Sequence, residues 1–429
     1  MTMKMRLGIA LAVFSMGSAC AQEIVLRHQA DGPTLDVLAT QILRFNDSLQ
    51  GKGKVILQDA RGVEDRRILP HVALLDPADS MEFFGTRPRF LPLHQVMREA
   101  KQKFNTNLMY PQILDAVDDA GGKIQALPLG LALPVLLTNR AFLKRAGLDA
   151  QASPQTWQDL QKTAGAISES GVGCPLTSSR FSWVHVENIS SQAGVPMVVR
   201  ERRTERINAN SLIAVKHLAL LASWQKSHYF RYDGLALEGD ERFLSGECAM
   251  LTGASSLYAA AVRAGIDVNI SRLPYYDDVH GAKPADTLPD GISLWTLAGY
   301  KPNDYKLVAR LVVYLMRPDV QQEWVRATSY LPMTPAAVAA LRESGIPGNL
   351  LDAAEKRLSA PRKGSTRMKA GLLRDRLHEF LGEELPMVWD AGRPAKEALD
   401  ATVSRLVALD PPPVVKAAKA SPVVKASKK

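Results

Sequence analysis

This 429-residue chain is poor in aromatic residues, in cysteine and in long apolar stretches. Phe, Trp and Tyr make up 6% of it, and three cysteines are present. After residue 21 no apolar run has the length needed to cross a bilayer. Hydrophobic residues make up 46%, an ordinary share for a globular protein. This composition argues against a small disulfide-rich scaffold, and the length predicts two domains.

The sequence also lacks the short motifs that mark common enzyme sites. It contains no His-Glu-x-x-His, no Gly-x-Ser-x-Gly, no P-loop and no Gly-x-Gly-x-x-Gly. Its eight histidines are scattered without the spacing of a metal site. We therefore expect no catalytic residues, no cofactor and no metal. An exported enzyme remains an alternative, because acid–base carboxylates have no local signature.

The first 21 residues have the pattern of a cleaved export signal. Lys4 and Arg6 precede an apolar segment, residues 7–16, and Ala19-Cys20-Ala21 predicts cleavage before Gln22. The alternative is a lipoprotein anchored through Cys20. Gly17 stands where that motif requires Leu or a similar apolar residue. We therefore favour export to the periplasm without an anchor.

Two cysteines, Cys174 and Cys248, follow the export signal. In an oxidising compartment such a pair suggests a disulfide. Alternatively, both are small buried hydrophobic residues, which free cysteines often are. The sequence does not decide between the two.

The formal net charge is +9, and part of the excess lies at the C-terminus. Residues 411–429 repeat a Pro-Val-Val-Lys-Ala unit without aromatic side chains, so we expect a disordered basic tail. Such a tail solubilises a protein or, alternatively, contacts anionic envelope surfaces or nucleic acid. No module elsewhere interleaves aromatic and basic residues, so nucleic acid is not an expected partner.

Short apolar segments alternate with amphipathic ones along the chain, which predicts an α/β fold with largely parallel sheets. The expected strands are 24–27, 54–58, 72–75, 134–138, 248–252, 268–273 and 292–298. The expected helices include 35–45, 305–316, 320–328, 372–389 and 394–409.

The segment from Asn139 to Leu160 carries the most specific pattern. A helix over 140–146 ends at Gly147, which suits a left-handed stop. After a short connector, Thr156 and Asp159 have the spacing of a capping box at the start of a second helix. This helix pair, with the preceding Ala126-Leu-Pro-Leu-Gly130, resembles family 1 extracellular solute-binding proteins of ABC importers. Within that family the chain is most similar to the branch that binds sn-glycerol 3-phosphate.

The resemblance implies a two-lobed periplasmic binding protein fold with discontinuous lobes, a hinge and a ligand cleft between them. Lobe one would comprise 22–135 plus about 285–335, and lobe two 136–284 plus about 336–410. It further implies a monomer that captures a sugar, polyol, glycerol phosphate or glycerophosphodiester and delivers it to ABC permease subunits in the inner membrane. The alternative is a degenerate binding protein that acts as a sensor or envelope scaffold without transport.

Several segments match the family's ligand-contacting elements and imply site residues. Trp183 would offer its indole face to the C–H side of a sugar or glycerol; alternatively it is a core tryptophan. Ser255 and Ser256 would donate to an anion, or simply form a turn. Gly291 would allow close backbone approach, or mark a strand entry. Tyr330 would donate its hydroxyl to the solute, or pack a helix end against the sheet.

Arginine is the natural partner of a phosphate. The family's C-terminal arginine corresponds ambiguously to Arg374 or Arg376, either of which is alternatively a solvated helix residue. Arg180 lies where the glycerol-phosphate branch has a tryptophan, and would supply a cation or face water.

The first lobe departs from the family's pattern. Gln58-Asp-Ala-Arg-Gly62 lacks the expected tyrosine, Asp76 replaces a glutamate, and Leu131-Ala-Leu-Pro134 lacks a hydroxyl. Leu26-Arg-His28 replaces an aromatic cluster. Since closure on a ligand requires contacts from both lobes, either the solute differs from that of the branch or closure is lost.

Overall fold

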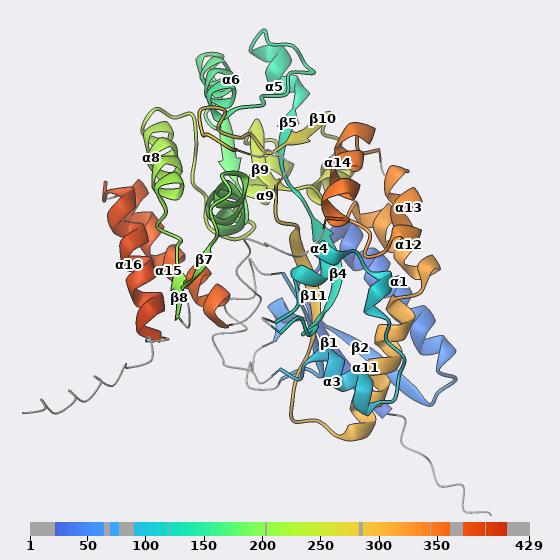
Figure 1. Cartoon of the computed structure of the whole chain (residues 1–429). Helices are drawn as coiled ribbons and strands as arrows, with labels where there is room; N and C mark the ends of the chain where they lie inside the picture. The colour runs from blue at the N-terminus through green and yellow to red at the C-terminus, as the bar shows by residue number, and fades with distance from the viewer. Residues whose placement is uncertain are drawn as a thin grey trace, which may run out of the picture.

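The computed structural model describes residues 22–63, 69–76, 90–119, 121–201, 204–282, 286–343, 345–360, 372–390 and 392–409. The expected export signal and the expected basic tail lie outside these ranges. Within them, two lobes are built around two separate sheets (Figure 1). No helix in this part of the chain is both long and apolar enough to cross a membrane.

Lobe one is built on a five-stranded sheet with the order β2-β1-β3-β11-β4. Its strands are β1 (Gln22–His28), β2 (Gly53–Asp59), β3 (Val72–Leu75), β4 (Leu127–Ala132) and β11 (Asp290–Thr296). Strand β1 pairs in parallel with β2 and β3, with Leu26 opposite Leu57 and Val72. Strand β11 is antiparallel to both β3 and β4. The sheet therefore combines an N-terminal parallel part with β4, which leads into the other lobe, and β11, which returns from it.

Apolar faces of helices cover this sheet. Helix α1 (Gly32–Ser48) buries Leu38, Ile42 and Phe45, the face that its sequence spacing predicts. The other lobe-one elements are η1 (Ala60–Gly62), α3 (Leu93–Glu99), η2 (Thr106–Leu108), α4 (Pro111–Asp115), α11 (Pro302–Leu315), α12 (Pro318–Thr328), η4 (Pro335–Ala337), α13 (Val338–Arg342) and α14 (Gly348–Leu358).

Lobe two is built on a four-stranded sheet with the order β10-β5-β9-β6. Its strands are β5 (Pro134–Asn139), β6 (Leu176–Ser178), β9 (Met250–Ala254) and β10 (Val268–Arg272). Strand β5 is antiparallel to β9 and β10, whereas β6 and β9 are parallel. A separate hairpin pairs β7 (Val198–Glu201) with β8 (Thr204–Ile207).

The helices of lobe two lie around this sheet (Figure 1). They are α5 (Arg140–Arg145), α6 (Trp157–Glu169), the π-helix η3 (Trp183–Asn188), α7 (Ile189–Gln192), α8 (Leu212–Lys226), α9 (Glu238–Leu244), α10 (Leu257–Arg263), α15 (Leu372–Trp389) and α16 (Ala395–Leu409). The predicted helix pair is confirmed: Gly147 has φ +70° after α5, and Thr156 accepts a hydrogen bond from Asp159 N at the start of α6.

Two expectations about the architecture were wrong. The sheets are mixed rather than largely parallel, because strands that cross between the lobes return antiparallel to their neighbours. Residues 336–360 were expected in lobe two. However, α13 packs on α12 and α14 packs on α4, both of which belong to lobe one. Of the described C-terminal elements, α15 and α16, which pack on each other and on α8, join lobe two.

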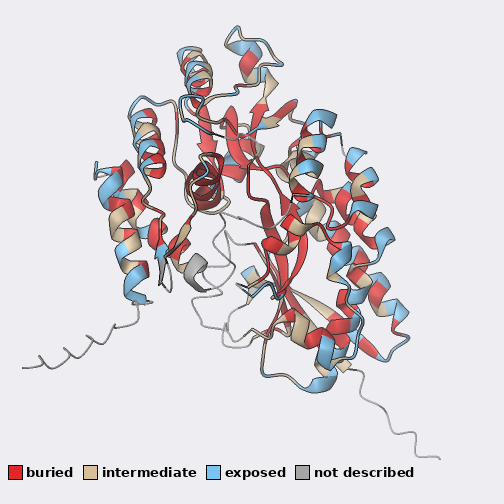
Figure 2. Cartoon of the chain, viewed as in Figure 1, coloured by how far each residue is buried: buried red, intermediate tan, exposed pale blue. Residues whose placement is uncertain are grey.

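Both sheets are buried, and exposed residues lie on the outer faces of the helices (Figure 2). Strand β5 is buried from Pro134 to Thr138, and all six residues of β4 are buried. In lobe two, Cys174 and Cys248 form a disulfide with a Cα–Cα distance of 4.6 Å. It joins the segment before β6 to the segment before β9, next to the paired ends of these strands.

Candidate functional site

A cavity of about 190 Å³ lies where the two lobes meet. Lobe one contributes the ends of β1 and β3, the start of α1 and the residues after α12. Lobe two contributes Arg180 together with residues along α9 and α10. Side chains from the carboxyl ends of strands β1 and β3 therefore face the other lobe, the usual position of ligand sites in α/β sheets.

Arg180 is the central group of this cavity and connects the two lobes. Its Nη2 lies 2.8 Å from Asp76 Oδ2 of lobe one, and its Nη1 lies 3.0 Å from Asp240 Oδ2 of lobe two. Its Nε also donates to Asp76 Oδ2, at 3.3 Å. Arg180 is only 11% exposed, and Asp76 and Asp240 are buried too. The three side chains form a buried clasp across the cleft, hereafter the Asp76–Arg180–Asp240 clasp.

The electrostatics of the clasp follow from its burial. Burial by itself would lower the pKa of Arg180, but Asp76 and Asp240 raise it above its ordinary value, so the guanidinium stays charged. Burial raises the pKa of the Asp240 carboxyl, while Arg180 opposes that shift. A charge buried this deeply is stable only while its partners remain in place.

Local backbone structure positions Arg180. It follows β6 in the left-handed region, with φ +48°, a conformation that costs a non-glycine residue on the order of 1 kcal/mol. Hydrogen bonds offset this cost: Arg180 N donates to Ala236 O at 2.6 Å, and Phe181 N donates to Leu235 O at 2.9 Å. Non-glycine residues in this conformation are often found at functional sites.

Glycine at position 239 brings α9 close to this turn. A Cβ at Gly239 would lie 2.1 Å from Ser178 O, so any side chain there would push α9 away from β6. Asp240, the next residue, reaches Arg180 because of this close packing.

Tyr330 and Ser256 form a second contact between the lobes. Their side chains are hydrogen-bonded to each other, and both line the cavity. Burial raises the pKa of the Tyr330 phenol, and the nearby Arg180 opposes this shift. The Tyr330 ring stacks on Trp324 with a centroid distance of 6.3 Å. A Cβ at Gly130 would lie 2.7 Å from this ring, so glycine in β4 makes room for it.

The mouth of the cavity is more exposed and is also polar. Gln29, Asp31 and Thr34 lie around the start of α1, and Glu241 lies opposite them on α9. Leu257 and Ala260 of α10 provide the apolar part of the rim. The lining therefore offers hydrogen-bond donors and acceptors from both lobes together with an apolar surface of similar extent.

Four of the residues predicted for the site are brought together in this cavity: Asp76, Arg180, Ser256 and Tyr330. Three others, Trp183, Ser255 and Gly291, are absent from its lining and lie instead where the chain crosses between the lobes. Arg374 lies in α15, but its side chain is outside the described residues. Arg376 makes an ion pair with Glu379 within the same helix.

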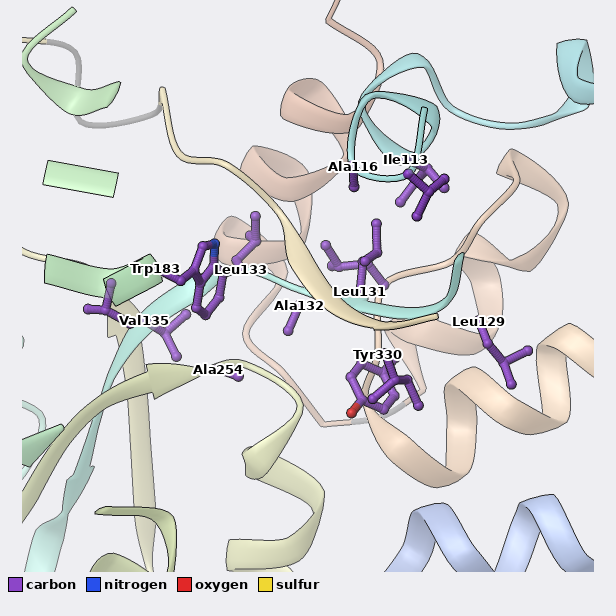
Figure 3. Packing of buried hydrophobic residues seen from close by; sticks show 14 of the residues in the cluster. Ile113, Ala116, Leu129, Leu131, Ala132, Leu133, Val135, Trp183, Ala254 and Tyr330 are labelled. Carbon is purple, nitrogen blue, oxygen red and sulfur yellow. The ribbon is translucent and has the colours of Figure 1, made fainter. Parts of the chain in front are cut away.

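Trp183 belongs to the buried interior beside a crossing strand, near Leu133 and Val135 (Figure 3). It is only 2% exposed, and its Nε1 donates to Leu288 O at 2.7 Å. Leu288 N in turn donates to Asn188 Oδ1 of η3, at 2.7 Å. This geometry fixes the segment that enters β11, and it does not support the predicted contact between the indole face and a solute.

Ser255 and Gly291 hold the other crossings in place. Ser255 Oγ accepts from Leu133 N at 3.1 Å, and Ser255 N donates to Leu133 O at 2.9 Å, between β4 and β5. A Cβ at Gly291 would lie 2.3 Å from Gly130 O, so β11 can approach β4 this closely only with glycine at position 291. Both residues act on the hinge strands in this geometry.

Sequence reasoning missed Asp240 and the start of α1. The segment from Gln29 to Thr34 follows the first strand of a βα unit, and the position of ligand sites at strand carboxyl ends was a usable signal for it. Asp240 had no comparable signal, because only the close packing of α9 on β6 brings it to Arg180.

Among the described residues, one group has the geometry of potential metal ligands: Cys174, Cys248 and Asp233. The two cysteines are bridged, so neither offers a thiolate. Asp233 pairs with Arg231 instead.

Comparison with known proteins agrees with this architecture. An sn-glycerol-3-phosphate-binding periplasmic protein UgpB from Yersinia pestis is 30% identical over 325 residues, which cover 73% of each chain. The UgpB protein of Pectobacterium atrosepticum is 27% identical over 416 residues, 92% of this chain and 93% of its own.

Solved structures share the fold at lower identity. UgpB from Mycobacterium tuberculosis in complex with glycerophosphocholine has a TM-score of 0.69 and 17% identity, covering 91% of this chain and 99% of that one. Maltose-bound MalE3 from T. maritima has a TM-score of 0.66 and 16% identity, covering 91% and 100%. The profile of bacterial extracellular solute-binding proteins matches residues 68–344. With two lobes, a cavity between them and this match over most of its length, the chain belongs to the bacterial extracellular solute-binding proteins.

Proposed function

We propose that this protein is exported to the periplasm and there, as a monomer, captures one small hydroxylated solute between its lobes for an ABC importer. The solute binds in the cavity formed by Asp76, Arg180, Ser256 and Tyr330, with Asp240 completing the site. Lobe closure then presents the loaded form to the permease subunits. No bond is made or broken in this cycle.

The observation that carries the proposal is a cavity that receives polar side chains from both lobes. A ligand that touches both lobes stabilises their closed arrangement by the difference between its affinities for the closed and open forms. Asp76 and Tyr330 come from lobe one, and Arg180 and Ser256 come from lobe two. A hydroxylated solute suits this lining, because each hydroxyl group donates one hydrogen bond and accepts others.

The volume of the cavity limits the size of the solute. About 190 Å³ lies below the roughly 300–1,000 Å³ of most small-molecule sites. Relatives named for sn-glycerol 3-phosphate, and structures that hold maltose or glycerophosphocholine, are hydroxylated-compound binders. For this chain we expect a solute no larger than a monosaccharide or a small polyol.

The contacts at the crossing segments support a hinge mechanism. Trp183, Ser255 and Gly291 fix the backbone on either side of the points where the chain passes between the lobes. Rigid segments that flank a short flexible connection allow the lobes to move as bodies.

The test is a thermal-shift screen of the purified chain against sugars, polyols, glycerol phosphate and glycerophosphodiesters. A ligand at 100 times its Kd adds about 2.7 kcal/mol to the stability of the native state and raises Tm. A hit should also leave the lobes closed, with a radius of gyration in small-angle X-ray scattering no larger than that of the unliganded chain. A folded sample with no hit in a broad panel would contradict the proposal and favour the scaffold alternative.

A matched pair of tyrosine variants links any hit to the cavity. Tyr330→Phe removes the hydroxyl group that faces the site, and we expect a loss of about 1 kcal/mol, roughly fivefold in Kd by calorimetry. Tyr314→Phe makes the same chemical change on α11, away from the cavity lining, and should leave Kd unchanged.

A further inference from the structure

The first crossing between the lobes is held from both sides within three residues. Strand β4 of lobe one continues through Leu133 into β5 of lobe two. Leu131 O accepts a hydrogen bond from Leu331 N of lobe one, at 2.6 Å. Leu133 N donates to Ser255 Oγ of lobe two, and Leu133 O accepts from Ser255 N. Ala132 joins the two anchored residues (Figure 3).

The planarity of the peptide bond turns these anchors into a pivot at one residue. Leu131 O belongs to the peptide group that ends at Ala132 N, so this group moves with lobe one. Leu133 N belongs to the peptide group that begins at the Ala132 carbonyl, so that group moves with lobe two. The φ and ψ angles of Ala132 are the torsions between the two groups. A rotation of the lobes that keeps both sets of hydrogen bonds is therefore taken up by these two angles.

The second crossing, which enters β11, is held by lobe two as far as Leu288. Leu288 N donates to Asn188 Oδ1 and Leu288 O accepts from Trp183 Nε1, each at 2.7 Å. Both partners belong to η3, so the peptide groups on either side of Leu288 move with lobe two. One contact reaches this segment from lobe one, since Arg357 Nε of α14 donates to Thr287 O. The long arginine side chain is able to follow a small rotation close to the axis.

Lobe one holds the same crossing from Gly291 onward. Gly291 is paired with Leu131 in the sheet of lobe one. A rotation that preserves the anchors on both sides is taken up by Pro289 and Asp290, whatever else these two residues contact. The register pairs Asp290 with Ala132, so the two pivots lie side by side.

Given the lobe closure of the proposed function, we propose that the lobes rotate about an axis through Ala132 and the Pro289–Asp290 pair. A few residues that absorb the change in φ and ψ are the usual form of such a hinge. The third crossing, between α14 and α15, includes residues 361–371, which lie outside the described ranges.

The proposal divides the contacts into two groups. The anchors next to the axis, at Leu131, Leu133 and Leu288, stay formed when the lobes open. Contacts between the lobes that are farther from the axis separate; these are Arg180–Asp76, Tyr258–Gly345 and Arg263–Asp36. Because both pivots are short and lie together, lobe two returns to one position at each closure, and Arg180 meets Asp76 again.

The experiment measures the distribution of distances between the lobes in the absence of any solute. Spin labels at Glu99→Cys on α3 of lobe one and Lys226→Cys on α8 of lobe two report this distribution by double electron–electron resonance. Both positions are exposed, and the disulfide-bonded cysteines of lobe two do not take up label. Asp76→Ala is present in all samples, so that the buried clasp does not hold the lobes closed.

A pair of glycine variants tests the pivot itself. Ala132→Gly should widen the distance distribution roughly twofold, because glycine has access to a larger range of φ and ψ. Ala73→Gly makes the same change in β3, inside the sheet of lobe one, and should leave the width unchanged. Equal widths in these two variants would overturn the proposal.

A pair of serine variants tests the anchor on the side of lobe two. Ser255→Ala removes the hydroxyl that accepts from Leu133 N, and it should also widen the distribution. Ser190→Ala removes a buried hydroxyl in α7 of the same lobe and should not. If the two alanine variants have the same width, Ser255 does not hold the pivot and the assignment is wrong.

Hydrogen exchange of the Asp76→Ala chain tests which contacts persist. The amides of Leu133, Leu288 and Leu331 should be as protected as that of Leu251 in β9, because their anchors remain formed in the open state. Loss of protection at these three amides while Leu251 stays protected would exclude the proposed axis.

The failure of this inference is distinguishable from the failure of solute capture. An empty thermal-shift screen would count against solute capture, and the distance distributions would still support the pivot if only Ala132→Gly and Ser255→Ala widened them. Distributions that no variant widens would count against the pivot, and a hit in the screen would still support capture.

Discussion

The two lobes bury their polar side chains in different ways. In lobe two, a connected set lies inside the lobe: His185 Nδ1 is 2.8 Å from His217 Nε2, whose ring contacts the Tyr276 hydroxyl through Nδ1 at 2.9 Å. His185 Nε2 also lies 2.9 Å from the hydroxyl groups of Ser178 and Thr252. In lobe one, the buried side chain of Gln41 donates to the backbone at Val320 O, and Thr334 Oγ1 donates to Gln321 Oε1.

The difference suggests that the two lobes have different roles in forming the site. The network and the disulfide of lobe two connect β6, β9, η3 and α8. These interior contacts fix the position of the elements that form its half of the cavity. Lobe one presents Asp76 directly after β3 and Tyr330 after α12, and Tyr330 is supported locally by Thr328 and Trp324 of that helix rather than by a disulfide. We infer that lobe two is the preorganised half of the site and that lobe one moves onto it.

Arg180→Ala should cause the largest loss of stability. Arg180 belongs to lobe two, the preorganised half of the site, and also binds Asp76 of lobe one. The change removes the guanidinium that pairs with the buried Asp240 and Asp76, and removing one partner of a buried pair costs about 3–5 kcal/mol. Chemical denaturation should show this loss.

Asp76→Ala is the informative comparison for Arg180→Ala. It removes only the lobe-one partner and leaves Arg180 paired with Asp240. We expect a smaller loss of stability and a larger radius of gyration in scattering, as the lobes separate. Equal losses in the two variants would contradict the assignment of Arg180 to the rigid half.

The disulfide should account for the next largest share of stability in lobe two. Cys174 and Cys248 are 74 residues apart, and closing a loop of this length stabilises the native state by about 4.5 kcal/mol in the chain-entropy treatment. The double variant Cys174→Ser, Cys248→Ser should lower Tm in calorimetry. We expect the transition to split, with lobe two unfolding first.

Reduction provides the control for the disulfide. Dithiothreitol should lower Tm of the unmodified chain and leave the double variant unaffected. A single unsplit transition that shifts as a whole would show that the lobes unfold as one unit, against the proposed division.

Acid should weaken lobe two through its buried histidines. Burial lowers the pKa of His185, with His217 adding to the shift, and burial lowers the pKa of His217 to about 3. Both pKa values lie below that of an unfolded histidine, about 6.5. The stability they contribute is thus complete above pH 6.5 and is lost as pH falls below it, by about 1.4 kcal/mol per pH unit for each ring.

The measurement for the histidines is the free energy of unfolding at pH 7.5 and 5.5. We expect a loss of about 3 kcal/mol from the two rings over this interval. The variant His185→Asn, His217→Gln should be less stable at pH 7.5 but should lose less on acidification. His280→Gln, at an exposed position, serves as the control, and a pH profile that the double variant does not flatten would exclude the buried rings as its cause.

Much of the architecture was predictable because local periodicity determines it. The bounds of β3 and α15 agree with the predicted segments, and the apolar face of α1 is the predicted one. Strand β4 was missed because Pro128 and Gly130 argue against a strand. Proline is tolerated there since β4 lies at the edge of its sheet, and the missing Cβ of Gly130 accommodates the ring of Tyr330.

The site was less predictable, because its key contacts join distant parts of the chain. Asp76 and Arg180 are 104 residues apart, and no local pattern indicates their pairing. Resemblance to a family drew attention to Trp183, Ser255 and Gly291. In this structure the three residues contact the segments that cross between the lobes. The motifs that contain them are therefore also explained by the packing of these crossings.

A second ion pair between the lobes provides the smallest expected effect. Arg263 of α10 and Asp36 of α1 lie 2.9 Å apart, but their side chains are 56% and 69% exposed. Exposed pairs contribute at most about 1 kcal/mol, because water and salt screen them. Arg263→Ala should therefore change the free energy of unfolding by less than about 1 kcal/mol and leave the radius of gyration unchanged. An opening as large as that of Asp76→Ala would mean that surface charge, and not the buried clasp, holds the lobes together.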